Sequence, residues 1–302
     1  CVAAMTQVEP AVVVVMETEL WLNFLWSAKL TLAKTCVANG RISEKSLSKS
    51  KWIRFIYEEI FSHVDAALMQ TEADADRARK LGARETKVFG NSKYDEAIAA
   101  NAVDWSGLGD GPIVAVGSVR GEEEERFVIE ALKGISVKIV LAPRHLERTD
   151  ELEKTAKAAG FETGRRSRGE DSAPLLILDT FGELASLYEV ADVAVIGGGF
   201  ADLGGQNIIQ PMAAGCPVIC GSHMRNFRAP FESGLARGAL KVAATPEELH
   251  DVIRLLLEDD ELRKSMARAG KALVSENQGA SARYANEIAE LARSFHASRH
   301  IQ

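Results

Sequence analysis

Short, continuous apolar runs recur along the sequence with helix-like segments between them, and this alternation constrains the fold more than any other feature. The first run covers residues 12–15, and five more cover 113–117, 137–142, 175–178, 193–196 and 217–220. A run that is apolar throughout is typical of a strand buried on both faces of a parallel sheet. The segments between the runs repeat apolar residues at helical spacing, as crossover helices do. The sequence therefore predicts an α/β fold with parallel sheets covered by helices.

The strand–helix pattern lapses between Asp95 and Gly111, where Ala, Asn, Asp and Gly dominate. We therefore predict a domain boundary that separates residues 1–95 from residues 96–302. The buried-strand run at 12–15 begins close to Cys1, and no initiator Met precedes it. We expect from this that the N-terminal domain is incomplete.

Three local signals add detail to this outline. Thr71 is followed by acidic residues and Thr245 by a proline and two glutamates, so we predict a helix N-cap at each threonine. A last helix is predicted over residues 280–294. The segment 164–173 is rich in arginine and glycine and is predicted to be a solvated loop, with a binding role for its arginines as the less favoured alternative.

Composition excludes some classes of function. The net charge of −7 argues against a general nucleic-acid binder, because such a protein needs a basic face to displace counterions. Cys216 and Cys220 lie in an apolar run, and no His or Cys pair with zinc-type spacing is nearby. We interpret them as small core residues with reduced thiols and expect neither a metal nor a cofactor. No apolar run is long enough to span a bilayer.

A loop with five glycines, residues 197–207, follows the strand predicted at 193–196. In an open parallel sheet, ligands bind beyond the carboxyl ends of the strands. Glycines let backbone amides approach an anion, and a helix is predicted to begin near Asn207, so the loop is a candidate phosphate site. A merely flexible turn is the alternative. The glycine spacing fits neither the dinucleotide-binding fingerprint nor the P-loop.

Small, polar or cationic residues follow three other strands of the same predicted domain. Ser118 follows the first strand. Arg144 follows the second, where its guanidinium suits a phosphate or carboxylate, although a surface arginine is the alternative. Asp179 and Thr180 follow the third and are interpreted first as caps of the next helix. Because these strand ends share one edge of the sheet, together they predict a nucleotide-phosphate site.

Charged residues also mark the N-terminal domain. Glu17 and Glu19 come directly after the strand at 12–15, and we expect one of them to face a ligand. Stabilisation of the first turn of a helix is the plain alternative. Lys93 lies beside the predicted domain boundary, where a surface lysine is the default and a lysine facing a cleft would suit an anionic sugar.

Eight motifs together resemble the 3-deoxy-D-manno-octulosonate (Kdo) transferases in order and spacing, over essentially the whole chain. They are Met16-Glu17-Thr18-Glu19-Leu20-Trp21-x-Asn23, Asn39-Gly40-Arg41-Ile42-Ser43, Gly90-Asn91-Ser92-Lys93-Tyr94-Asp95, Ala142-Pro143-Arg144-His145, Asp179-Thr180-Phe181-Gly182-Glu183-Leu184, Gly204-Gly205-x-Asn207, Gly221-x-His223-x-x-Asn226-Phe227 and Asn277-Gln278-Gly279-Ala280. The resemblance implies a GT-B fold of two Rossmann-like domains, the N-terminal one incomplete, with the last helix packing back on it. It also implies transfer of Kdo from CMP-Kdo to a lipid A precursor in lipopolysaccharide biosynthesis, without a metal or cofactor. The expected location is the cytoplasmic face of the bacterial inner membrane, with peripheral membrane contact.

The resemblance also implies roles for individual residues. Residues 96–302 would bind the CMP-Kdo donor, and residues 1–95 would belong to the acceptor-binding domain. Glu17 and Lys93 match positions that stabilise the transition state. The positions that match donor-binding residues are Ser118, Pro143, Arg144, Phe181, Gly182, Glu183, Gly204, Gly205, Asn207, Ile208, Ile209 and Gln210.

Several positions depart from the family pattern. The general base of the family is a glutamate in an early Ser-Val-Gly-Glu motif that this sequence lacks, so we expect no transfer by this chain alone. Leu22 replaces a proline, Gln206 a histidine, and Gln210 the glutamate that holds the ribose. Ser118-Val119-Arg120 stands in place of Ser-Thr-His. These changes leave two alternatives open: a GT-B glycosyltransferase or epimerase that uses a UDP-sugar, and a non-catalytic module that binds a nucleotide sugar.

Overall fold

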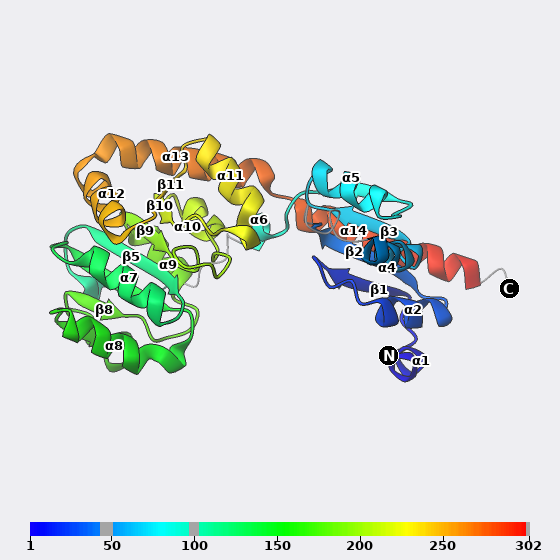
Figure 1. Cartoon of the computed structure of the whole chain (residues 1–302), viewed down its shortest axis with the longest axis horizontal. Helices are drawn as coiled ribbons and strands as arrows, with labels where there is room; N and C mark the ends of the chain where they lie inside the picture. The colour runs from blue at the N-terminus through cyan, green and yellow to red at the C-terminus, as the bar shows by residue number, and fades with distance from the viewer. Residues whose placement is uncertain (43–50, 97–102, 300–302) are drawn as a thin grey trace. The chain divides into compact units, whose positions relative to one another are not determined.

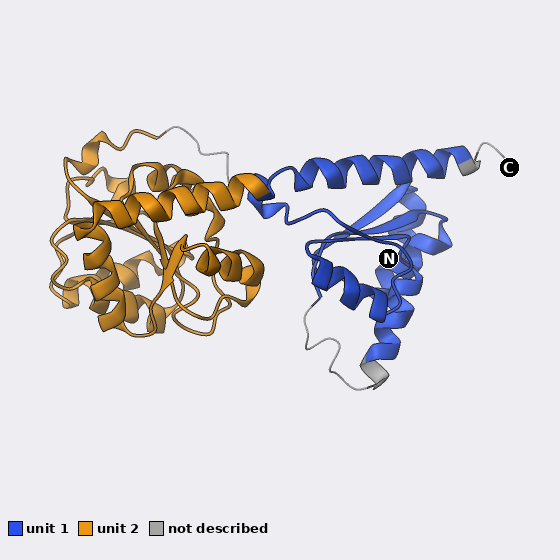
Figure 2. Ribbon diagram, turned by 90° about the horizontal axis from the view of Figure 1, so that it is seen from above, with its two compact units in different colours: residues 1–95, 277–302 blue, residues 96–276 orange. Residues whose placement is uncertain are grey.

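The computed structural model describes residues 1–42, 51–96 and 103–299. The chain forms two compact units, shown in different colours in Figure 2. Unit 1 consists of residues 1–95 and 277–302, and unit 2 of residues 96–276. Ser43 of the second motif and residues 97–102 of the predicted boundary lie outside the described residues.

Unit 1 is built on a four-stranded parallel sheet in the order β1-β2-β3-β4 (Figure 1). The strands are β1 (Val12–Met16), β2 (Lys34–Gly40), β3 (Ala66–Met69) and β4 (Thr86–Val88). Its described helices are α1 (Val2–Val8), α2 (Leu22–Leu30), α4 (Lys51–Ser62), α5 (Glu72–Lys80), the short α6 (Lys93–Glu96) and α14 (Ala280–Arg299).

Helices cover both faces of this sheet. Val37 of β2 packs in one apolar cluster with Leu25 of α2 and Phe61 of α4. Its neighbour Cys36, which points to the other face because side chains alternate along a strand, packs in a second cluster with Tyr284 of α14. A helix from the far end of the sequence therefore completes the core that the N-terminal strands begin.

Unit 2 is built on a seven-stranded parallel sheet in the order β11-β10-β9-β5-β6-β8-β7. The strands are β5 (Ile113–Val119), β6 (Lys138–Pro143), β7 (Thr163–Arg165), β8 (Leu175–Ile177), β9 (Val193–Ile196), β10 (Val218–Cys220) and β11 (Leu240–Val242). The α-helices are α7 (Glu122–Leu132), α8 (Thr149–Ala158), α9 (Leu184–Val190), α10 (Ile209–Ala214), α11 (Arg228–Ala236), α12 (Pro246–Glu258) and α13 (Asp260–Asn277). The described residues of this unit also form four short 3₁₀ turns: η1 (Ser106–Leu108), η2 (Leu146–Arg148), η3 (Arg166–Arg168) and η4 (Arg225–Phe227).

The central strand β5 shows how this sheet is enclosed. Val116 packs in an apolar cluster with Leu132 of α7 and Ile253 of α12. Gly117, on the opposite face, abuts the hydroxyl of Tyr188 of α9, so closely that a β-carbon there would overlap it. Helices on both faces explain why the strand is apolar at consecutive positions.

The predicted α/β class is confirmed, and each of the six apolar runs overlaps a strand of one of the two parallel sheets. The prediction that the run at 12–15 is buried on both faces is wrong within the described residues, because β1 lies at the edge of its sheet and its burial alternates along the strand. Both predicted caps are confirmed, because Thr71 Oγ1 accepts the amide of Asp74 and Thr245 Oγ1 accepts the amide of Glu248. Cys216 and Cys220 are buried core residues, as interpreted. Within the described residues, no helix combines the length and the apolar character that a membrane span needs.

The prediction of a solvated loop at 164–173 is wrong for the first half of the segment. The segment begins in the edge strand β7 and continues into η3, and only its second half is a loop, largely exposed. The side chains of Arg165 and Arg166 are only 12% and 16% exposed, and both pair with carboxylates. A strand that is short and polar gives no apolar run, so the sequence pattern did not indicate it.

Candidate functional site

The strand order of unit 2 reverses between β5 and β9. From β5 the chain passes to β6, then to the edge strand β7 and back to β8 on one side, and later through β9, β10 and β11 on the other. Open α/β sheets generally bind their ligands at the carboxyl ends of the two strands that flank such a reversal. Ser118 lies near the end of β5 and the glycine loop 197–207 follows β9, so both predicted elements lie at this edge of the sheet.

The backbone is unusually close-packed at this point. Ser118 has a left-handed backbone with φ of 59°, and the pairing of β5 with β6 shifts register between Gly117 and Val119. A β-carbon on Gly197 would lie 2.6 Å from the Ser118 carbonyl oxygen, so only glycine fits there. A non-glycine residue in this conformation at a strand end is a feature that gathers at functional sites.

The buried side chain of Glu124 fixes the first half of the glycine loop. It comes from the first turn of α7 and is 0% exposed. Its carboxylate accepts the amides of Gly198 at 2.7 Å, Phe200 at 3.1 Å and Arg120 at 2.8 Å. These bonds offset the free-energy cost of burying a carboxylate. They also occupy two loop amides, so the prediction that the loop offers its amides to an anion is wrong for Gly198 and Phe200.

Gly204 and Gly205 close the second half of the loop against the segment that follows β10. The amide of Gly205 donates to the Gly198 carbonyl at 2.7 Å. A β-carbon on Gly204 would lie 3.0 Å from the Asn226 side-chain carbon Cγ, and one on Gly205 would overlap the Met224 sulfur. Both glycines are therefore required by packing within the protein.

Helix α10 begins at Ile209, slightly later than predicted, and Asn207 Oδ1 accepts the Ile209 amide at 2.9 Å. The side chains of Ile208 and Ile209 are fully buried, so only their backbone could meet a ligand. Among the described residues, the amides of Ile208 and Gln210 have no protein acceptor. The start of α10 thus keeps backbone donors available.

Arg144 stands at the carboxyl end of β6, next to β5. Its amide donates to the Val119 carbonyl at 2.8 Å, and Pro143 pairs with Val119 in the sheet. Pro143 is buried, whereas the Arg144 side chain is exposed. Within the described part of the chain its guanidinium has no carboxylate partner. The backbone of Arg144 is therefore held at the end of β6, beside Ser118, and its exposed guanidinium is available to bind an anion.

The loop Asp179–Glu183 follows β8. The prediction that Asp179 or Thr180 caps the next helix is wrong, because Asp179 accepts the amide of Ser167 at 2.8 Å and its hydroxyl at 2.6 Å. The Thr180 hydroxyl donates to the Glu183 carboxylate, which also receives Arg166. Burial raises the pKa of Glu183, but the bonds from Thr180 and Arg166 outweigh it and hold the pKa below the ordinary value.

At the centre of this loop, Phe181 is 87% exposed, and Gly182 has φ of 84°, which glycine adopts without strain. An exposed aromatic ring on a loop fixed at both ends can stack against a planar ligand.

In unit 1, the structure brings the two predicted catalytic residues together. Lys93 Nζ lies 2.7 Å from Glu17 Oε1. Glu19 instead accepts the indole of Trp21 at 2.6 Å on the exposed surface, so the two carboxylates do project differently. Glu17 follows β1 and Lys93 begins α6, beyond β4.

The loop that carries Lys93 is fastened from several sides. Asn39 Oδ1, at the end of β2, accepts the Ser92 amide at 3.1 Å. The Tyr284 hydroxyl of α14 donates to the Gly90 carbonyl at 2.7 Å, and Asp95 accepts the amides of Gly279 and Ser281. The position of Lys93 is therefore fixed by contacts spread through the unit.

Two residues near the predicted site were not singled out from the sequence: Glu124 and Arg166. Glu124 lies in the run Glu122–Glu125, which by itself indicates only an exposed, acidic helix start. Arg166 lies in a segment that lacks strand or helix periodicity. No feature of the sequence distinguished either residue from its charged neighbours.

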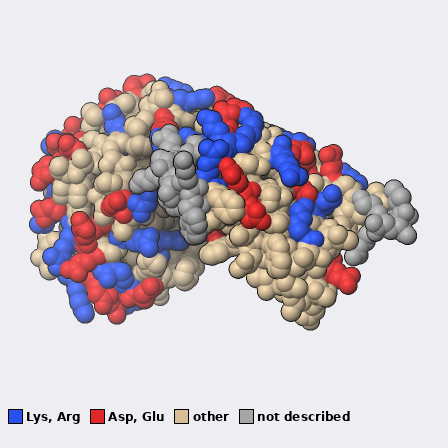
Figure 3. Space-filling view, turned by 45° about the vertical axis from the view of Figure 1, so that its right-hand side comes forward, with Lys and Arg blue, Asp and Glu red and all other residues tan. Residues whose placement is uncertain are grey.

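No group of three or more His, Cys, Asp or Glu side chains in the described ranges is arranged to hold a metal ion. In Figure 3 acidic and basic side chains are interspersed over the visible face of unit 2, without a broad field of one sign.

Comparison with known proteins gives the family. Residues 1–96 match the family model described as 3-deoxy-D-manno-octulosonic-acid transferase (kdotransferase), and residues 178–273 match glycosyl transferases group 1. The chain is 34% identical to a 3-deoxy-D-manno-octulosonic acid transferase of Bordetella pertussis over 284 residues, 89% of this chain and 66% of that protein. It is 30% identical to the Haemophilus influenzae protein of the same name, over 90% of this chain and 68% of the relative. The chain thus spans about two thirds of the length of these relatives.

A solved structure agrees with the fold of part of the chain. The C-terminal CMP-Kdo binding domain of WaaA from Acinetobacter baumannii superposes with a TM-score of 0.53 and 25% identity, over 56% of this chain and 92% of that domain. The resemblance noted from the motifs and the GT-B fold are both confirmed. The chain belongs to the 3-deoxy-D-manno-octulosonic-acid transferase family.

Proposed function

We propose that unit 2 binds CMP-Kdo and that the protein transfers Kdo to a lipid A precursor, at the cytoplasmic face of the bacterial inner membrane. The observation that carries the proposal is the grouping of Ser118, the glycine loop and Arg144 at the carboxyl ends of the neighbouring strands β5, β9 and β6, where the strand order reverses. The solved CMP-Kdo binding domain that superposes on part of this chain supports the choice of nucleotide.

In the proposed reaction, an acceptor hydroxyl oxygen forms a bond to the anomeric carbon of Kdo while the bond from that carbon to the CMP phosphate oxygen breaks. The hydroxyl proton passes to a general base, which the family resemblance assigns to a motif absent from these 302 residues. CMP leaves with the bonding electrons. We propose that no metal is needed, because Arg144 and the amides at the start of α10 can neutralise the phosphate.

We assign Glu17 and Lys93 to the Kdo side of the reaction. A lysine held 2.7 Å from a carboxylate is preplaced, and it can exchange that partner for the carboxylate of the sugar. Unit 1 would accordingly belong to the acceptor-binding part of the protein. Large apolar side chains are exposed on and beside α2, which suits an acceptor with lipid chains and peripheral membrane contact; they are Trp21, Trp26, Leu30 and Leu32.

Donor binding is the step that the described residues can perform, so it is the step to test. Calorimetric titration of CMP into the purified chain should show binding, and Arg144→Ala should weaken it about tenfold or more, the cost of a lost charge-assisted hydrogen bond. Arg126→Ala is the matched control, because Arg126 is an exposed arginine of the same unit that pairs with Glu122 on α7. A folded chain that ignores CMP would overturn the proposal, and binding of UDP in its place would favour the UDP-sugar alternative.

A further inference from the structure

The 3₁₀ turn η3 contacts the loop Asp179–Glu183 at both of its ends. Ser167 gives its amide and its hydroxyl to the carboxylate of Asp179, at 2.8 Å and 2.6 Å. Arg166 gives Nε and Nη2 to the two carboxylate oxygens of Glu183, at 3.3 Å and 3.2 Å. Adjacent residues of one turn thus hold the first and last residues of the loop.

Arg166 is itself held in place by other groups. Its guanidinium carbon lies 4.7 Å from the centre of the Trp105 ring, a cation–π contact. Nη1 also pairs with Asp171, and Nη2 donates to the Asp104 carbonyl at 3.2 Å. A side chain with this many partners and 16% exposure has little freedom to move, so it can transmit a fixed position to Glu183.

Trp105 also helps to fix the backbone at the end of the Asp179–Glu183 loop. The indole of Trp105 donates to the Ser186 hydroxyl at 3.2 Å, and that hydroxyl donates to the Glu183 carbonyl at 2.8 Å. Trp105 is therefore linked to Glu183 indirectly, through Ser186 and through Arg166. Between the fixed ends, Phe181 remains 87% exposed.

We propose that η3 is a clamp that holds the Asp179–Glu183 loop in its nucleotide-binding conformation, with Arg166 as the positioning residue. The inference rests on the proposed function, because it assumes that this loop contacts the donor nucleotide. A loop that is already ordered loses less conformational entropy when a ligand binds, so loosening it lowers affinity without removing a ligand contact. The lowered pKa of Glu183 agrees with a carboxylate that is kept charged and paired.

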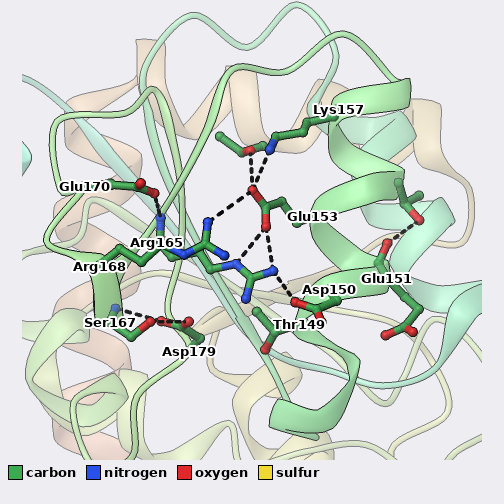
Figure 4. A network of polar contacts seen from close by, with 12 residues as sticks. Thr149, Asp150, Glu151, Glu153, Lys157, Arg165, Ser167, Arg168, Glu170 and Asp179 are labelled. Atoms are coloured by element: carbon green, nitrogen blue, oxygen red, sulfur yellow. Dashed lines mark hydrogen bonds and ion pairs between the residues drawn. The ribbon is translucent and has the colours of Figure 1, made fainter.

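The chain offers a matched control in the preceding residue. Arg165 is 12% exposed and also bonds two carboxylates, Glu153 Oε2 at 2.7 Å and Asp150 Oδ1 at 2.5 Å. Both partners lie on α8, away from the loop, as Figure 4 shows, whereas Ser167 reaches Asp179 on the other side of the segment. Arg165 and Arg166 therefore have similar burial and each bonds two carboxylates, but Arg166 also contacts Asp104 and Trp105, and the two arginines hold different elements.

The test is a double-mutant cycle on CMP affinity, measured by calorimetry. We expect Arg166→Met to weaken CMP binding about tenfold and Arg165→Met to change it less than about twofold, even if both lower the thermal stability. If Arg166 acts through Glu183, Arg166→Met should have less than about a twofold further effect in the Glu183→Gln background. If Arg166→Met weakened CMP binding only through general structural damage, its effect on the affinity would instead add to that of Glu183→Gln.

A second variant covers the case in which Arg166→Met does not fold. Asp179→Ala releases the other end of the loop and should also weaken CMP binding several-fold, while the chain stays folded by circular dichroism. Unchanged CMP affinity in Asp179→Ala, or equal losses in the Arg165 and Arg166 variants, would overturn the clamp and leave the proposed function standing. A wild-type chain that does not bind CMP would overturn both.

Discussion

Lys93 and Glu17 meet from opposite edges of the unit 1 sheet, with Nζ of the lysine 2.7 Å from Oε1 of the glutamate. Glu17 holds a left-handed backbone with φ of 54°, a conformation that is costly for a residue with a β-carbon. The two side chains are 24% and 29% exposed, and such a pair contributes at most about 1 kcal/mol. The ion pair alone therefore does not explain why a glutamate occupies this strained position, which agrees with the role that we propose for Glu17.

This strain can be measured with two substitutions of Glu17. Glu17→Ala removes the carboxylate and keeps the β-carbon, whereas Glu17→Gly removes both. We expect Glu17→Gly to be more stable than Glu17→Ala by about 1 kcal/mol, because glycine adopts positive φ freely. Urea unfolding followed by circular dichroism gives the comparison. If Glu17→Ala were the more stable of the two, the left-handed strain would be absent.

Glu124→Gln should destabilise the protein strongly. The carboxylate accepts three backbone amides in a fully buried site, and a carboxamide has only one oxygen to replace two. We expect a loss of about 2 to 3 kcal/mol in the free energy of unfolding. Glu123→Gln, at an exposed position in the same helix turn, should stay within about 0.5 kcal/mol of the parent. Equal effects of the two substitutions would show that Glu124 does not hold the glycine loop.

Gly221→Ala tests the contact between the two loops that follow β9 and β10. A β-carbon at Gly221 would overlap the carbonyl of Gly199 and the amide of Phe200, which are backbone atoms and cannot rotate away. We expect a loss of at least about 3 kcal/mol, measured by thermal unfolding. The exposed neighbour Ser222 provides the control, since Ser222→Ala should be nearly neutral. Normal stability of Gly221→Ala would mean that the loops separate easily.

Asp95 should contribute to stability in a pH-dependent way. Partial burial raises its pKa, but the amides of Ser281 and Gly279 bond the charged form and leave the pKa below the ordinary value. A carboxyl that binds protons more weakly when folded gives its full stabilisation above the unfolded pKa of about 3.9, and loses it as the pH falls through the lower folded pKa.

Asp95→Asn should therefore lower stability by about 1 kcal/mol at neutral pH, as loss of a helix cap does, and the difference from the parent should shrink below about pH 4. Thermal unfolding from pH 7 to pH 3 measures both effects. Glu96→Gln, at the exposed adjacent position, is the control. A difference that stays constant down to pH 3 would contradict the role of the charged Asp95.

The sequence predicted the parts of the fold that depend on apolar periodicity. Strands of the unit 2 sheet that are buried on two faces, such as β5 and β9, appeared as continuous apolar runs, and the site residues were expected where those strands end. The edge strands β7 and β11 are short and contain charged residues, so they gave no such signal, whereas the edge strand β1 did give an apolar run.

Contacts between residues that are distant in the sequence could not be predicted from the sequence alone. Glu124 looks like its exposed neighbours, and only the fold shows that it turns inward to meet the amide of Gly198. Likewise, the role that we infer for Arg166 depends on its bond to Glu183, which lies in the loop after β8. Side-chain partners of this kind depend on the three-dimensional path of the chain, which local propensity does not encode.

The return of α14 to unit 1 has a consequence for how the polypeptide is made. All of unit 2 is synthesised before α14, yet Tyr284 and Ala280 of that helix complete the apolar cluster on one face of the first sheet. During translation, unit 2 can finish folding while unit 1 still lacks the helix that covers one face of its sheet. This reverses the usual order, in which N-terminal domains fold first. A premature stop codon before α14 would therefore spare the later-made unit and leave the earlier-made one open to chaperones and proteases.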